Sequence, residues 1–173
     1  QLIQCRRALK PDGLLLAVTF GGRTLQELRA ALGQAEIELT GGLSPRVAPM
    51  GEIRDLGGLL QRAGLAMPVA DGVAQTVSYA TPFDLMRDLR AMGETNALHA
   101  RLRNPTRRAV LMRAAELYAH GFAGADGRIT ATFETIVLTG WAPDASQPQP
   151  LRPGSANARL ADALGTREAP LKD

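Results

Sequence analysis

Apolar and polar positions follow two different patterns in the parts of the chain that we predict to be strands. The run from Leu14 to Phe20 is apolar almost without interruption, which predicts a strand covered on both faces by helices. Pro11 and Gly13 mark a turn immediately before it. The run from Arg128 to Trp141 alternates between apolar and polar residues, which predicts a half-polar strand. A third strand is predicted from Pro68 to Tyr79.

Apolar residues recur at helical spacing in the segments around these strands. Thr24 and Glu27 have the spacing of a capping box, so a helix is expected to begin there. Thr81 is the expected cap of another helix, with Pro82 at its first helical position and Gly93 at its end. The predicted helices cover residues 2–9, the segment that begins at Thr24, and residues 51–63, 82–93 and 104–121.

This order of helices and strands is typical of an α/β fold. Ligands of open α/β sheets bind beyond the carboxyl ends of the strands. Phe20, Gly21 and Gly22 end the strand at 14–20, so we expect them to border the substrate site. Residues 1–141 are expected to form one domain, and residues 142–173 a polar, proline-rich tail.

Several short phrases carry a family resemblance. The sequence LKPDG at 9–13, followed by an apolar strand, is similar to the fifth strand of class I S-adenosylmethionine-dependent methyltransferases. Further phrases are GGLSPR at 41–46, DLGGLL at 55–60, DLRAMGETN at 88–96 and Gly140-Trp141. Together they resemble the C-terminal half of the mitochondrial complex I assembly-factor family that is built on a methyltransferase fold, and its bacterial relatives. The biotin-biosynthesis malonyl-carrier-protein methyltransferases are more distantly similar.

The resemblance implies a partial Rossmann-like sheet made of the late strands of a methyltransferase. Its inserted helical cover would occupy about residues 80–125. The S-adenosylmethionine site of that family lies mostly in earlier strands, which have no counterpart here. We therefore expect a partial chain whose cofactor-binding residues lie upstream of Gln1, and we expect the complete protein to be an enzyme but this fragment alone to be inactive.

Four polar residues are candidates for substrate contacts. The loop at 39–49 carries Ser44 and Arg46, and an arginine can hold a carboxylate or phosphate with two hydrogen bonds. The alternative for this loop is a surface linker. Glu94 and Asn96 follow the end of a predicted helix, and the resemblance places them in the cover over the substrate. Their alternative role is ordinary helix termination, and no catalytic residue is identified.

These features favour the substrate-side half of a methyltransferase-like enzyme that acts on a protein or an acyl carrier protein. The resemblance also includes proteins that hydroxylate an arginine, so arginine hydroxylation is one alternative. The other is a non-catalytic module for complex I assembly. An incomplete sheet would expose apolar surface, which predicts either a homodimer or aggregation for the isolated chain.

Charge and composition narrow the choice of partner. The formal net charge is only +3, and the cations are nearly all arginines, which suggests a GC-rich genome more than a selected basic surface. Arg101, Arg103, Arg107 and Arg108 are interpreted as a solvated helix entrance, with contact to an acidic partner or nucleic acid as the alternative. We expect no nucleic acid partner, because the cluster lacks aromatic residues.

The positions of the histidines argue against a metal site, and the hydropathy of the chain argues against a membrane span. Cys5 is the only cysteine and is predicted to be a small buried residue. His99 and His120 lack the spacing of metal ligands, so no metal is expected. No apolar run approaches the ~20 residues that span a bilayer. The expected location is the cytoplasm in a bacterium, or the mitochondrial matrix in a eukaryote.

Overall fold

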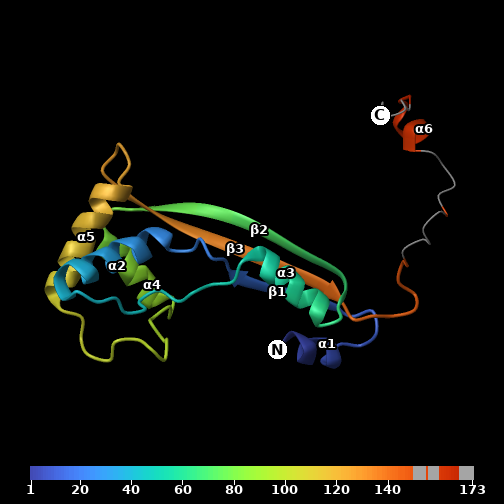
Figure 1. Ribbon diagram of the computed structural model, residues 1–173, viewed down its shortest axis with the longest axis horizontal. Helices are drawn as coiled ribbons and strands as arrows, with labels where there is room; N and C mark the ends of the chain where they lie inside the picture. The colour runs from blue at the N-terminus through green and yellow to red at the C-terminus, as the bar shows by residue number, and fades with distance from the viewer. Residues whose placement is uncertain (150–154, 156–159, 168–173) are drawn as a thin grey trace, which may run out of the picture. The chain divides into compact units, whose positions relative to one another are not determined.

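The computed structural model describes residues 1–149, 155 and 160–167. The chain divides into a unit at Gln1–Pro143 and a second at Asp144–Asp173. In order, the elements are α1 Leu2–Ala8, β1 Leu14–Phe20, α2 Gln26–Thr40, α3 Ile53–Arg62, β2 Ala66–Tyr79, α4 Pro82–Ala91, α5 Arg108–Phe122, β3 Ile129–Trp141 and α6 Leu160–Leu164. Figure 1 shows the first unit with α2, α4 and α5 gathered at one end of the sheet.

Among the described residues, the strands form one sheet in the order β1-β3-β2. β3 is antiparallel to both of its neighbours, with Val18 opposite Val137 and Val73 opposite Thr135. The mixed α/β class is confirmed. The alternating strand at 128–141 therefore lies at the centre of this sheet, beside the strand at 14–20.

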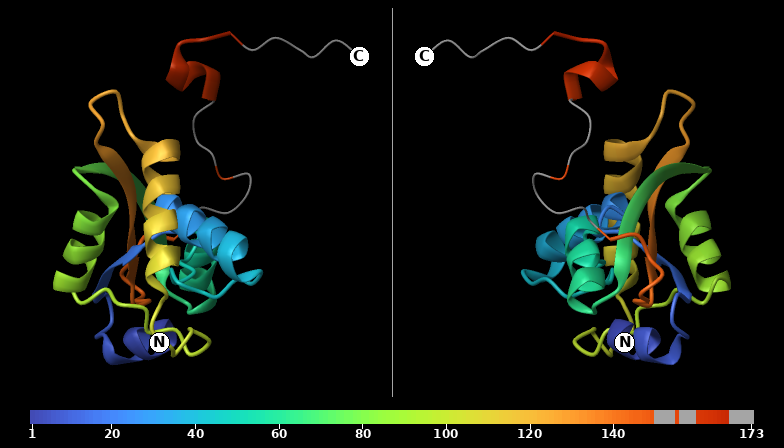
Figure 2. Two further views of the ribbon diagram at one scale, coloured as in Figure 1. Left: turned by 90° about the vertical axis from the view of Figure 1, so that its left-hand side faces the viewer. Right: turned by 90° about the vertical axis from the view of Figure 1, so that its right-hand side faces the viewer.

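Two cores pack on opposite faces of β3. Ile129 and Ala131 belong to a core with α2, α4 and α5, whereas Ile136 and Leu138 belong to a core with α3. Successive side chains of a strand point to opposite faces, so these two pairs face opposite ways. Seen end-on in Figure 2, the helices of the first core surround one end of the sheet.

The prediction that β1 is covered on both faces is wrong. Leu16 and Val18 are 62% and 63% exposed, and Leu14 is also exposed. These side chains share one face of β1, and no described helix packs on that face. Leu15 and Ala17, on the other face, pack against the second core. An uninterrupted apolar run shows that both faces are suited to burial, but it does not show that this chain buries both.

The capping box predicted at the start of α2 is also wrong. Leu25 is the N-cap residue, with a left-handed φ of 55°, and no side chain caps the helix. The Thr24 hydroxyl instead donates to the carbonyl of Glu134 and accepts from its N–H. The Glu27 carboxylate accepts from the N–H and the hydroxyl of Thr132. Both side chains are therefore directed toward β3.

These contacts satisfy hydrogen-bonding groups along a part of β3 where no described strand is paired on the β1 side. β1 ends opposite Thr135, so the edge of β3 before that residue lacks a strand partner on that side. Side chains of the α2 entrance, together with the Leu25 N–H donating to the Thr132 carbonyl at 2.8 Å, satisfy that edge. The buried Tyr118 hydroxyl extends the same pattern by donating to the Thr130 carbonyl at 2.8 Å. Burial, with a smaller effect from Glu27, raises the pKa of the Tyr118 phenol.

In the segment predicted to cover the substrate, α4 begins as predicted, whereas α5 begins later than predicted. Thr81 caps α4 by accepting a hydrogen bond from the N–H of Asp84, and Pro82 is the first helical residue, as predicted. α5 begins at Arg108, later than the predicted start at residue 104, and it ends at Phe122. Asn104 and Pro105 instead lie in the loop before it.

Cys5 is exposed on α1, contrary to the prediction, because that short helix buries none of its residues. In the second unit, Ser146 donates its N–H and its hydroxyl to the Asp144 carboxylate. The described helices include none with the length and hydropathy needed to cross a membrane.

Candidate functional site

A cavity of about 510 Å³ opens between α2, α4 and two loops. Its wall is mainly apolar and includes Leu28 and Leu89 from the two helices. Three of the predicted substrate residues line it, namely Arg46 from one loop and Glu94 and Asn96 from the other. Glu94 and Asn96 are exposed at the rim. The structure therefore brings together residues that are about fifty positions apart in the sequence.

The other predicted residues lie near this cavity without lining it. Ser44 lines an adjacent cavity of about 330 Å³ that also includes Arg46. Phe20 lines a narrow pocket of about 20 Å³ together with Glu94. The Phe20 ring lies 6.3 Å from the Phe133 ring, measured between their centroids.

Gly21 and Gly22 line none of these described cavities. A Cβ atom on Gly21 would collide with the carboxylate of Glu134, and one on Gly22 would collide with that of Glu52. Glu134 also accepts a hydrogen bond from the backbone N–H of Arg23 at 2.9 Å. The two glycines thus allow acidic side chains to pack against the end of β1.

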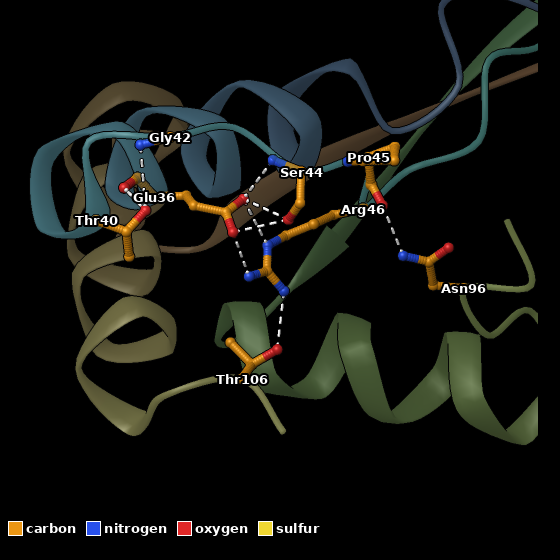
Figure 3. A network of polar contacts seen from close by, with 8 residues as sticks. All are labelled: Glu36, Thr40, Gly42, Ser44, Pro45, Arg46, Asn96 and Thr106. Carbon is orange, nitrogen blue, oxygen red and sulfur yellow. Dashed lines mark hydrogen bonds and ion pairs between the residues drawn. The ribbon is translucent and has the colours of Figure 1, made fainter. Parts of the chain in front are cut away.

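Glu36 of α2 organises the loop that carries Ser44 and Arg46. Its carboxylate accepts hydrogen bonds from the Ser44 N–H at 3.0 Å and the Ser44 hydroxyl at 2.7 Å. It also accepts two from Arg46, through Nε at 3.1 Å and Nη2 at 2.8 Å. Figure 3 shows both side chains pointing at this single carboxylate. The side chains of Arg46 and Glu36 are only 15% and 5% exposed, so the ion pair is nearly buried.

The same network connects the loops on either side of the cavity. Arg46 Nη1 donates to the hydroxyl of Thr106 at 2.8 Å, just before α5. Asn96 donates from Nδ2 to the carbonyl of Pro45 at 2.8 Å (Figure 3). Since each of these contacts joins a loop of the cavity to another segment, Glu36 indirectly fixes the shape of the opening.

Burial disfavours the charged form of Glu36, but the hydrogen bonds from Arg46 and Ser44 outweigh it and lower the pKa of the carboxyl below its ordinary value of 4.5. The role predicted for Arg46, binding an anionic substrate, stays a prediction. Its guanidinium is already engaged by Glu36, so an anion would have to share or replace that partner.

A pH titration of stability tests this arrangement. Because the pKa of Glu36 is lowered by folding, its contribution to stability is present above 4.5 and is lost as the pH falls through the lowered value. We expect Glu36→Gln to flatten the decline of the free energy of unfolding between about pH 5 and pH 3, measured by urea denaturation. A decline as steep as in the unmodified protein would show that Glu36 does not contribute to it.

Sequence reasoning missed Glu36 and also Arg90, an exposed residue that lines the main cavity. One signal was present. Leu28, Leu32 and Glu36 follow one another at intervals of four, so the glutamate lies on the apolar face of its helix. A charge at such a position requires a buried partner, but the sequence does not identify which of many arginines provides it.

Comparison with known proteins identifies two groups of proteins that are similar to this chain. The chain is 43% identical over 162 residues, or 93% of its length, to the mitochondrial arginine-hydroxylase NDUFAF5 of Dictyostelium discoideum. This chain is a homologue of that arginine-hydroxylase. It is also 34% identical, over 81% of its length, to a malonyl-[acyl-carrier protein] O-methyltransferase of Halorhodospira halophila. The resemblance drawn from the short phrases is thereby confirmed.

The homologous region is only part of these proteins. The chain spans 37% of the hydroxylase and 45% of the methyltransferase. No family model matches the chain. Among solved structures, it is similar to a putative methyltransferase of Bacillus halodurans, with 16% identity, a TM-score of 0.46, and coverage of 83% of this chain and 57% of that one.

S-adenosylmethionine, the cofactor that the family resemblance implies, stays a prediction. The described residues do not fit it at the end of β1, because carboxylates of Glu134 and Glu52 fill the space beside Gly21 and Gly22. Within the described part of the chain, no group of histidine, cysteine and acidic residues is arranged to hold a metal ion. The main cavity is therefore the candidate functional site among the described residues.

Proposed function

We propose that this chain forms the substrate-binding part of an enzyme that hydroxylates an arginine side chain of a protein. The observation that carries the proposal is the stronger of the two homologies. The match to an arginine-hydroxylase has higher identity and covers more of the chain than the match to a methyltransferase, at 43% over 93% against 34% over 81%.

The main cavity suits an arginine side chain. Its apolar wall can contact the methylene stem, and a guanidinium requires acceptors such as carboxylate and amide oxygens at the end of that stem. Glu94 and Asn96 carry such groups at the rim. Within the described residues, Glu94 makes no ion pair, so its carboxylate is available to a substrate cation.

Replacing Glu94 with glutamine tests this assignment. Glutamine keeps the size of the side chain but removes the charge, and we expect the dissociation constant of an arginine-containing peptide to rise about three- to tenfold. Isothermal titration calorimetry of the complete protein measures this change. Glu116→Gln provides the control, because Glu116 is an exposed glutamate of α5 that does not line the cavity. Equal effects of the two substitutions would remove Glu94 from the substrate site.

A second candidate is methyl transfer to a malonyl group on a carrier protein, the reaction named for the other homologue. It is favoured by Arg90, which lines the same cavity and makes no ion pair with a described residue. A malonyl carboxylate could bind to such a cation. Titration with malonyl-pantetheine separates the candidates, since binding that Arg90→Gln weakens would favour methyl transfer over arginine hydroxylation. Binding of neither ligand would favour the non-catalytic assembly module.

A further inference from the structure

The longest stretch without acidic residues in the first unit adjoins the main cavity. Residues 95–115 contain five arginines and no aspartate or glutamate, for a formal charge of +5. The whole chain carries +3, so the rest of the chain carries a net −2, which is +3 less +5. The excess of positive over negative charge in this protein therefore lies in one stretch of 21 residues.

Most of these arginines have no acidic partner in the described structure. Arg113 is neutralised by Glu38 and Glu116. Arg103, Arg107 and Arg108 are exposed and make no ion pair with a described residue. We call residues 101–108 the basic segment.

Local helix stability does not explain the basic segment. Arg107 is the N-cap of α5 and Arg108 its first residue, with no acidic residue in the first turn and no side-chain cap. Positive charges at this end of a helix oppose its macrodipole, and arginine is a poor N-cap residue. Residues that break a local rule in this way are candidates for a functional role.

Hydrogen bonds join the basic segment to residues that line the main cavity. Ala97 and Leu98, just before it, line the cavity, and Arg101 donates to the carbonyl of Leu98 at 2.9 Å. Thr106, within it, accepts the hydrogen bond from Arg46. A molecule that placed one side chain in the cavity would therefore have its neighbouring residues close to these arginines.

We propose that the basic segment binds acidic residues of the protein substrate that flank the side chain entering the cavity. This proposal rests on the proposed function in one respect, that the substrate is a protein. An acidic protein surface is favoured over single-stranded nucleic acid because residues 101–108 include no phenylalanine, tyrosine, tryptophan or histidine, so the basic segment itself offers no aromatic ring on which bases could stack.

The test uses fluorescence anisotropy with two labelled polyglutamate peptides, one with a central arginine and one with a central alanine. The test variant is Arg103→Glu/Arg107→Glu. Its control is Arg7→Glu/Arg54→Glu, which changes the net charge equally at exposed sites on α1 and α3. We expect the test variant to weaken binding of both peptides about five- to thirtyfold at low salt and the control to weaken it less than about twofold, with the difference shrinking at high salt.

Equal weakening by both variants would overturn the proposal, because it would reflect net charge rather than a site. Tighter binding of a labelled oligothymidine than of either peptide, lost in the same variant, would overturn it in favour of nucleic acid. If the charge reversal unfolds the protein, Arg103→Gln/Arg107→Gln, compared with Arg7→Gln/Arg54→Gln, gives the same test with a smaller and equally matched change of charge. If both peptides bind equally but depend on the basic segment, the arginine-hydroxylase function fails while this proposal stands.

Discussion

Replacing Glu36 with alanine is expected to lower the free energy of unfolding by about 3–5 kcal/mol. The substitution removes the carboxylate that accepts hydrogen bonds from Ser44 and Arg46, and it leaves the Arg46 guanidinium nearly buried without its counter-ion. An unpaired buried charge costs more than the ion pair itself contributes. Urea denaturation followed by circular dichroism measures the loss.

Glu38→Ala is the matched control for this substitution. Glu38 lies two residues further along α2 and also pairs with an arginine, Arg113, at 2.7 Å, but that pair is far more exposed. Exposed ion pairs contribute little to stability, so this variant should differ little from the unmodified protein. If Glu36→Ala were no more destabilising than Glu38→Ala, the network around Glu36 would have no energetic importance.

The Glu36 substitution should also affect ligand binding, although Glu36 does not line the main cavity. It positions Arg46, which in turn contacts Thr106, and these contacts set the relative places of the two loops. We expect Glu36→Ala and Arg46→Ala to weaken binding of an arginine peptide to a similar degree. The double variant should weaken it little further, because both residues act in one network.

Replacing Glu27 with alanine is expected to lower the free energy of unfolding by about 2–4 kcal/mol. The substitution leaves the N–H and the hydroxyl of Thr132 without an acceptor at a buried position. Each unsatisfied buried donor costs about 1–3 kcal/mol. Glu27→Gln retains one acceptor oxygen and should cost less than the alanine substitution.

Hydrogen exchange gives a local measure of the Glu27 effect. We expect the Thr132 amide to exchange faster in Glu27→Ala, while amides of β3 that are paired with β1, such as that of Ile136, change only with global stability. Ile37→Ala is the control, because Ile37 is 55% exposed on α2 and lies ten residues beyond Glu27. Unchanged protection of Thr132 would show that Glu27 does not substitute for a strand at this edge.

The strands were predictable because their patterns are local. The apolar run at 14–20 and the alternating run at 128–141 correspond closely to β1 and β3. The cap of α4 was predictable for the same reason, since Thr81 and Pro82 act on the backbone within a few residues. The roles of Thr24 and Glu27 were not, because their spacing also fits a capping box, whereas their actual partners lie more than a hundred residues away.

The candidate site was also predictable only in the part that depends on local sequence. The sequence alone identified Arg46, Glu94 and Asn96 as polar residues in phrases typical of the family, and it determined the order of the strands and helices that carry them. Only the tertiary structure decided that these three residues line one cavity and that Glu36 engages the guanidinium of Arg46. The physical reason is that local patterns determine backbone conformation and burial, whereas the partner of a buried charge depends on which distant segments the fold brings within hydrogen-bonding distance.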